Sequence, residues 1–138
     1  MPSVRPVVYV CGLMLFMLGL AMLVPLVVDL AAHNQDWPSF LSGSVITLFA
    51  GGLMVAGAGR PDAALKRREA FLLTASVWCL LPVFGALPLL FAHPALDFTD
   101  TMFEAVSGIT TTGATVMVGL DNEAPGILLW RSILQWIG

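Results

Sequence analysis

Three long runs without a charged side chain dominate this sequence: Val7 to Val28, Phe40 to Gly59 and Ala70 to Ala92. At a rise of ~1.5 Å per residue, each run is long enough as a helix to cross a hydrocarbon core of ~30 Å. Hydrophobic residues make up 58% of the chain and charged residues only 11%, a balance that excludes an ordinary soluble domain. The sequence therefore predicts an all-α integral membrane protein with the lipid bilayer as its surroundings.

Several functional classes are excluded by the remaining composition. The net charge of -3 and the lack of a basic cluster with interleaved aromatics argue against a nucleic-acid partner. Cys11 and Cys79 lie inside apolar runs, and His93 has no Cys, Asp or Glu at metal-ligand spacing. Because the sequence holds no Ser-His-Asp set, paired acids or phosphate-binding glycine loop, we expect neither an enzyme nor a cofactor.

The charges between the apolar runs predict the orientation of the chain in the membrane. Residues 60–69 hold four of the six Lys and Arg residues, whereas the connection from Asp29 to Pro38 holds acidic residues and no basic ones. The positive-inside rule places the N-terminus and residues 60–69 in the cytoplasm, and the segment after the third run outside. Arg5 ahead of the first run would also suit a signal peptide, but that run exceeds a signal core of ~7–15 residues.

Small residues and prolines indicate how the helices pack and bend. Gly52 and Ala56, four residues apart in the second run, are predicted to form a close contact with another helix. The alternative is that these small residues merely lower the hydrophobicity of the run. Pro25 is expected to bend the end of the first run, and Pro82 and Pro88 to kink the third unless neighbouring helices hold them.

A helix too short to cross the bilayer is expected after the third run. Asp97 and Asp100 are candidate N-caps, and Thr101 with Glu104 matches a capping box, so the helix is predicted over about 100–110. At ~15 Å, it would enter the membrane and stop midway. Its negative C-terminal end would favour a cation there, and Asp97, Asp100 and Glu104 are predicted to concentrate cations at an outer mouth.

The residues that follow this helix suit a strand that coordinates a dehydrated cation. Thr110, Thr111 and Thr112 offer carbonyl and hydroxyl oxygens, and Gly113 can adopt backbone angles closed to other residues. Non-helical backbone at membrane depth is tolerated only where it lines a wet cavity or is buried in protein, so residues 110–115 are predicted to line a pore. The alternative is a threonine-rich turn at the outer surface, with Gly113 as an ordinary turn residue.

Three segments of the chain, Phe103 to Thr115, Pro125 to Arg131 and Gln135 to Gly138, resemble the Trk/Ktr superfamily of potassium uptake proteins. The closest resemblance is to the bacterial TrkH/TrkG membrane subunits, and it covers the whole chain. It implies a pair of spanning helices over residues 1–59, a cytoplasmic loop over 60–69 and a first pore repeat over 70–138. Within that repeat it implies a span over 70–92, a pore helix over about 100–110, a filter over 110–115 and the start of an inner helix over 126–138.

For function, the resemblance implies potassium uptake across the bacterial inner (plasma) membrane, with this chain supplying one of four filter strands. Thr110 to Gly113 would coordinate potassium, the transported substrate, and the carbonyls of Thr111 and Thr112 would lie closest to the ion. Similar proteins form homodimers, bind a cytoplasmic nucleotide-binding regulatory subunit and often couple uptake to protons. Nothing in the residues themselves indicates proton coupling.

The last run departs from the family pattern. Residues 126–138 would reach only ~20 Å as a helix, and no second Thr-Gly segment follows. We therefore expect the N-terminal portion of a longer transporter, with a truncated last helix and three further pore repeats elsewhere. Two other functions stay open: a non-conducting membrane interaction or assembly protein, and a homotetrameric cation channel.

Arg131 is a costly charge in this last run and needs a partner. As the resemblance places it, near the outer end of the run, it is expected to bond a pore-loop carbonyl or Glu104. The alternative is an interfacial anchor beside Trp130.

Overall fold

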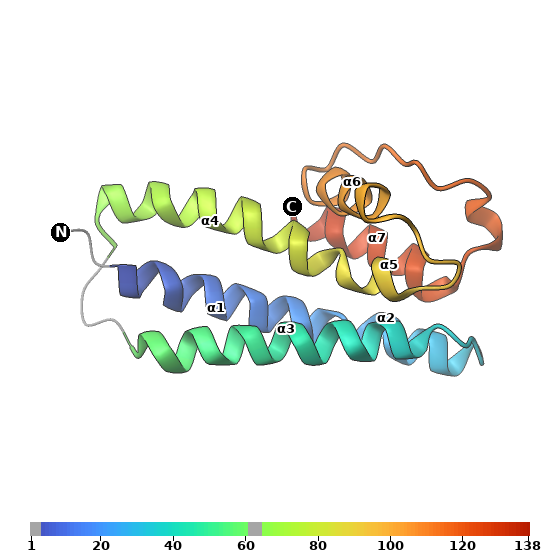
Figure 1. Cartoon of the computed structure of the whole chain (residues 1–138), viewed down its shortest axis with the longest axis horizontal. Coiled ribbons are helices and arrows are strands. Elements are labelled where there is room, and N and C mark those ends of the chain that lie inside the picture. The colour runs from blue at the N-terminus through green and yellow to red at the C-terminus, as the bar shows by residue number, and fades with distance from the viewer. Residues whose placement is uncertain (1–3, 61–64) are drawn as a thin grey trace.

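The computed structural model describes residues 4–60 and 65–138, and every regular element in this part of the chain is a helix (Figure 1). Residues 61–64 of the predicted cytoplasmic loop 60–69 lie outside the described residues. The helices are α1 (Val4–Ala21), α2 (Leu23–Ala31), α3 (Trp37–Ala58), α4 (Arg67–Gly85), α5 (Leu87–Phe91), α6 (Phe98–Ile109), the 3-10 helix η1 (Leu120–Asn122) and α7 (Pro125–Ile137).

Three helical stretches are long and apolar enough to cross a membrane: Val4–Ala31, Trp37–Ala58 and Arg67–Phe91. Each coincides with one of the three charge-free runs of the sequence. The predicted all-α membrane fold class is therefore confirmed. The division of the chain into the segments 1–59, 60–69 and 70–138 stays a prediction.

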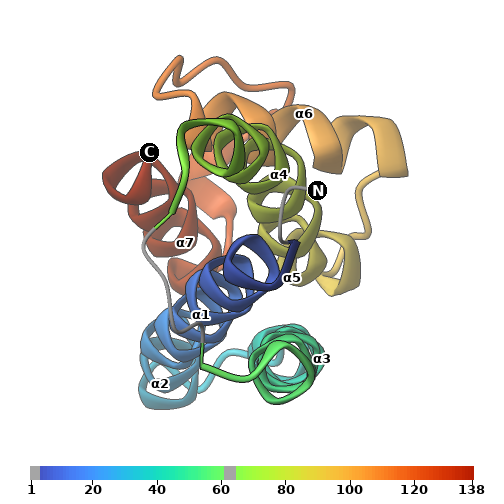
Figure 2. The same ribbon diagram turned by 90° about the vertical axis from the view of Figure 1, so that its left-hand side faces the viewer.

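The long helices run side by side, with α1 between α3 and α4 (Figures 1 and 2). In the half of the molecule away from the N-terminus, α7 packs against α2 on one side and α6 on the other. Figure 2 shows that α6 lies across the long helices rather than parallel to them. The chain that follows α6 returns toward the end opposite the N-terminus (Figure 1). Helices α6 and α7 thus pack against the N-terminal helices, α6 against α4 and α7 against α2.

Prolines interrupt two of the long stretches, as the sequence predicts. The helix breaks at Met22 between α1 and α2, three residues before Pro25, because Pro25 has no N–H to donate to the carbonyl of Ala21. A second break at Ala86 lies two residues before Pro88, which occupies the first turn of α5. Pro82 lies inside the continuous helix α4.

The predicted contact through Gly52 and Ala56 is not made with any helix among the described residues. Ala56 is exposed, and a Cβ added at Gly52 would meet nothing within 4 Å. The close approach is made instead by Gly51, where an added Cβ would lie 2.7 Å from the carbonyl oxygen of Gly12 and 2.7 Å from the amide nitrogen of Phe16. Small residues do allow α1 and α3 to pack closely, but the rotation of α3 about its axis decides which of them face α1.

The apolar core connects α7 to the N-terminal helices. Trp130 of α7 is completely buried, and its Nε1 donates a hydrogen bond of 2.8 Å to the carbonyl of Gly85. Its ring meets the ring of Phe40 in α3 edge to face, with centroids 6.3 Å apart. A buried indole whose N–H has a partner gains apolar burial without leaving an unsatisfied donor. This side chain therefore joins α3, α4 and α7 at one point.

Candidate functional site

The turn after α6 is held in a defined conformation by its amide groups. Thr111 and Gly113 have φ angles of +58° and +73°, both in the left-handed region. The N–H of Thr111 donates to the carbonyl of Gly108 at 2.9 Å. The N–H groups of Thr112 and Gly113 both donate to the carbonyl of Ser107, at 2.9 and 3.3 Å. The start of the non-helical segment 110–117, called the strand below, is thus tied to the last turn of α6.

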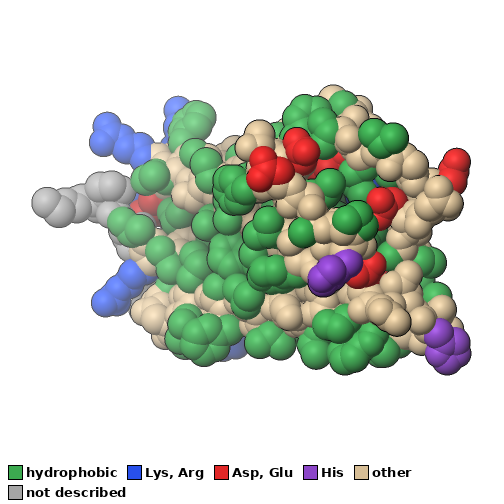
Figure 3. Space-filling model, turned by 45° about the vertical axis from the view of Figure 1, so that its right-hand side comes forward, with side chains coloured by type: hydrophobic (Ala, Val, Ile, Leu, Met, Phe, Trp, Pro, Cys, Tyr) green, Lys and Arg blue, Asp and Glu red, His purple; other side chains and the backbone are tan. Residues whose placement is uncertain are grey.

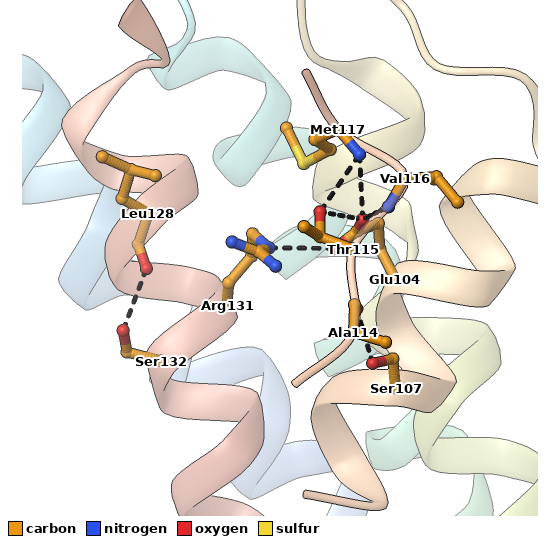
Figure 4. Close-up of polar contacts among 9 residues, drawn as sticks. All are labelled: Glu104, Ser107, Ala114, Thr115, Val116, Met117, Leu128, Arg131 and Ser132. Atoms are coloured by element: carbon orange, nitrogen blue, oxygen red, sulfur yellow. Dashed lines mark hydrogen bonds and ion pairs between the residues drawn. The ribbon is translucent and has the colours of Figure 1, made fainter. Parts of the chain in front are cut away.

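Ser107 holds this strand at a second point as well. Its side chain is nearly buried, and its hydroxyl donates to the carbonyl of Ala114 at 2.6 Å (Figure 4). Ser107 was not predicted from the sequence. A serine in the last turn of a short helix, within reach of the segment that follows, is the signal that could have indicated it.

The carbonyl side of the same strand is open. Among the described residues, no hydrogen bond is donated to the carbonyl oxygens of Thr110, Thr111, Thr112 or Gly113. All four residues are exposed. Two of the threonine hydroxyls are hydrogen-bonded: the Thr110 hydroxyl donates to the carbonyl of Val106 and lies 2.9 Å from the Thr112 hydroxyl. A segment whose N–H groups are bound to the protein and whose carbonyl oxygens are free can use those oxygens to replace the hydration shell of a cation.

The N-terminus of α6 differs from the predicted capping box. The helix begins at Phe98 with Asp97 as its N-cap residue, so Thr101 lies inside the first turns and its hydroxyl donates to the carbonyl of Asp97. Thr101 and Glu104 therefore do not form a capping box. Asp97 is exposed and Asp100 is partly exposed in the first turn, where negative charge is favourable next to the positive end of the helix.

Glu104 does not lie at a solvent-facing mouth, so that prediction is wrong. Its side chain is only 1% exposed. One carboxylate oxygen accepts hydrogen bonds from the Thr115 hydroxyl and from the N–H groups of Val116, at 2.7 Å, and Met117, at 3.3 Å (Figure 4). The other accepts from Arg131 Nε at 2.9 Å. A carboxylate enclosed by donors in this way holds the far end of the strand and cannot gather ions from solution.

Arg131 makes the bond to Glu104, which is one of the pairings that the sequence suggests. Its side chain is 16% exposed and lies on α7, so the ion pair joins α7 to α6 and to the strand. Arg131 does not project freely into an interface beside Trp130, because its guanidinium is held by Glu104 and Trp130 is itself completely buried. The pair has the geometry that a charge in a membrane-embedded helix requires, since each ion satisfies the other.

The glycine of the strand also faces α7. A Cβ added at Gly113 would lie 3.4 Å from Nε2 of Gln135, which is an ordinary van der Waals contact. One turn earlier in the chain, Gly108 packs on Leu134, whose Cβ would lie 3.0 Å from an added Cβ. The strand and the end of α6 therefore rest on one face of α7.

This chain matches known proteins along almost its whole length. Residues 36–138 match the family model of TrkH, described as a cation transport protein. The chain belongs to the TrkH family. It is 39% identical to the Trk system potassium uptake protein TrkH of Halomonas elongata, over 99% of this chain and 28% of that protein. It is 35% identical to the Trk system potassium uptake protein TrkG of Escherichia coli, over 98% of this chain and 28% of that protein.

The fold agrees with that of a solved TrkH family member. The crystal structure of the potassium transporter TrkH from Vibrio parahaemolyticus matches with a TM-score of 0.91 and 36% identity, over 96% of this chain and 29% of that chain. The resemblance to the Trk superfamily predicted from the sequence is thus confirmed. The chain spans less than a third of the length of these TrkH relatives.

Proposed function

We propose that this chain supplies one ion-coordinating strand to the pore of a potassium uptake protein. The observation that carries this proposal is the first part of the strand, Thr110 to Gly113, whose amides are bound to α6 while its carbonyls are open. The ion is assigned as potassium because the relatives are named as potassium uptake proteins. The chain then takes part in ion transport and not in catalysis.

In this mechanism the carbonyls of Thr111 and Thr112 replace water around potassium. The hydrogen bonds behind the strand keep these dipoles in place when the ion leaves, so little reorganisation accompanies each passage. The C-terminal end of α6 adds a partial negative charge of about half an elementary charge beside the strand. Asp97 and Asp100, at the other end of α6, remain as the acidic residues proposed to attract cations to the outer mouth.

We also propose the orientation that the positive-inside rule predicts. Figure 3 shows most Lys and Arg side chains at the end of the molecule where the N-terminus lies, and most Asp, Glu and His side chains in the other half. Residues 60–69 and the N-terminus would face the bacterial cytoplasm, and the loops around α6 would face outward. The chain would lie in the bacterial inner membrane.

The exposed carbonyl face of the strand implies neighbours that complete the ion's coordination shell. In the complete protein these are proposed to be three further pore repeats. The predicted homodimer and the cytoplasmic nucleotide-binding regulatory subunit are proposed as its other partners.

Rubidium uptake into potassium-starved cells that lack their own uptake systems tests this function. We expect uptake when the cells make a full-length transporter that carries this segment, and none above background with this chain alone, because one strand supplies only part of a coordination shell. Uptake with this chain alone would favour the homotetrameric channel. Stable expression without uptake by the full-length protein would favour the non-conducting assembly protein.

Replacing Ser107 with alanine tests how the strand is held. The variant keeps the backbone carbonyl that binds two amides but loses the hydroxyl bond to Ala114, worth about 1 kcal/mol. We expect the preference of the full-length transporter for rubidium over sodium to fall about fivefold. Ser132→Ala is the matched control, because its hydroxyl makes a similar bond to Leu128 on an exposed face of α7 (Figure 4). Equal effects of the two substitutions would contradict the role of Ser107.

A further inference from the structure

A carboxylate from the N-terminal helices caps the helix α7. Asp29 is completely buried at the end of α2, and its Oδ1 accepts a hydrogen bond of 2.7 Å from the N–H of Gly126, 97 residues later in the chain. Gly126 lies in the first turn of α7. The sequence suggested a polar connection that begins at Asp29, but α2 continues to Ala31 and carries this side chain into the protein.

The first turn of α7 leaves both a free N–H group and space for this carboxylate. Its N-cap residue is Ala124, which has no polar side chain and makes no capping bond. Pro125 at the first position has no N–H, so the free donor nearest the helix end is that of Gly126. A Cβ added at Gly126 would overlap all three terminal atoms of the Asp29 carboxylate. Only glycine at this position lets the carboxyl group approach, and the positive end of α7 favours an oxygen acceptor there.

The bond made by Asp29 is the first of a series of polar contacts that ends at the ion-coordinating strand. Asp29 bonds the start of α7, and Arg131, between one and two turns later on the same helix, bonds Glu104. Glu104 in turn accepts the N–H groups of Val116 and Met117 at the far end of the strand. A helix is stiff along its axis, so a change in the position of the start of α7 is passed to Arg131.

We propose that Asp29 is a positioning residue for the ion-coordinating strand. It sets the position of α7 along its axis and, through Arg131 and Glu104, the position of residues 115–117. The N-terminal helix pair then contributes to ion selectivity as well as to membrane anchoring. The second oxygen of Asp29 has no hydrogen-bond partner among the described residues, so the bond to Gly126 is the direct polar link that the inference rests on.

This inference rests on the proposed function, and its test separates the two. In a full-length transporter that carries this segment, rubidium uptake is measured with and without competing sodium, together with the thermal stability of the purified protein. We expect Asp29→Ala to lower the rubidium preference at least threefold. Asp29→Asn should lower it less, because the amide oxygen still accepts the bond from Gly126. Asp121→Asn, in the exposed helix η1, is the control and should leave the preference unchanged.

A role limited to stability predicts a different result. Asp29→Ala would then reduce the amount of folded protein and the total uptake but leave the rubidium preference as it is, and that outcome would overturn the inference. If the unsubstituted transporter takes up no rubidium, it is the proposed function that fails.

Gly126→Ala gives a second, independent test of the same contact. The added methyl would displace the carboxylate, so we expect a loss of rubidium preference similar to that of Asp29→Ala. In the double variant Asp29→Ala/Gly126→Ala the methyl enters the vacated space, so the loss should not exceed that of either single variant. Additive losses would show that the two residues act separately. If Asp29→Ala yields too little protein, the rubidium preferences of Asp29→Asn and Gly126→Ala are compared with that of the unsubstituted transporter instead.

Discussion

Gly113→Ala is expected to lower rubidium uptake by the full-length transporter about tenfold. The φ of Gly113 is +73°, a conformation that costs an L-residue roughly 1–2 kcal/mol. The added methyl would also lie 3.4 Å from Nε2 of Gln135 on α7. We therefore expect the strand either to be strained or to rotate its carbonyls away from the proposed ion position. A shift of about 1.4 kcal/mol corresponds to a tenfold change, and initial rates of rubidium uptake at equal expression measure it.

Gly119→Ala is the matched control for this prediction. Gly119 has nearly the same φ, +77°, but lies in the loop before η1, and an added Cβ would meet no atom closer than 3.9 Å. The cost to the backbone is the same, so a general effect of strain on folding would appear in both variants. We expect Gly119→Ala to leave uptake within about twofold of the unsubstituted protein. Equal losses, or no loss at Gly113, would show that the strand does not coordinate the ion.

Arg131→Gln is expected to be the most destabilising of the substitutions considered. It leaves the carboxylate of Glu104, 1% exposed, without its guanidinium partner. Removing one member of a buried ion pair typically costs about 3–5 kcal/mol. In the full-length transporter purified in detergent, the midpoint of thermal unfolding should therefore fall by at least about 3 °C.

Two further variants separate the ion pair from a general effect of losing charge. Arg68→Gln removes an exposed charge near the start of α4 and should leave the midpoint nearly unchanged. Glu104→Gln combined with Arg131→Gln removes both charges, so the double variant should be less destabilised than the sum of the single ones. If Arg131→Gln leaves stability, expression and uptake unchanged, the ion pair has no structural role.

The parts of the candidate site that lie close together in the chain were proposed from the sequence alone. Thr110 to Gly113 follow a short helix directly, and their residue types alone indicate a carbonyl-lined strand. Arg131 was identified because an isolated charge in an apolar helix needs a partner. Ser107 and the burial of Glu104 were not predicted, since both depend on how the chain folds back over α6 after residue 113.

The sequence by itself determined the class of the fold and the family, because the lengths of the apolar runs decide which segments cross a bilayer and the segment 103–115 is specific. Only the tertiary structure decided which residues meet across helices. Gly51 and not Gly52 packs on α1, and Asp29 caps a helix that begins 96 residues later. The physical reason is that each helix can rotate and slide within the bilayer at little cost until side chains from distant segments pack against it.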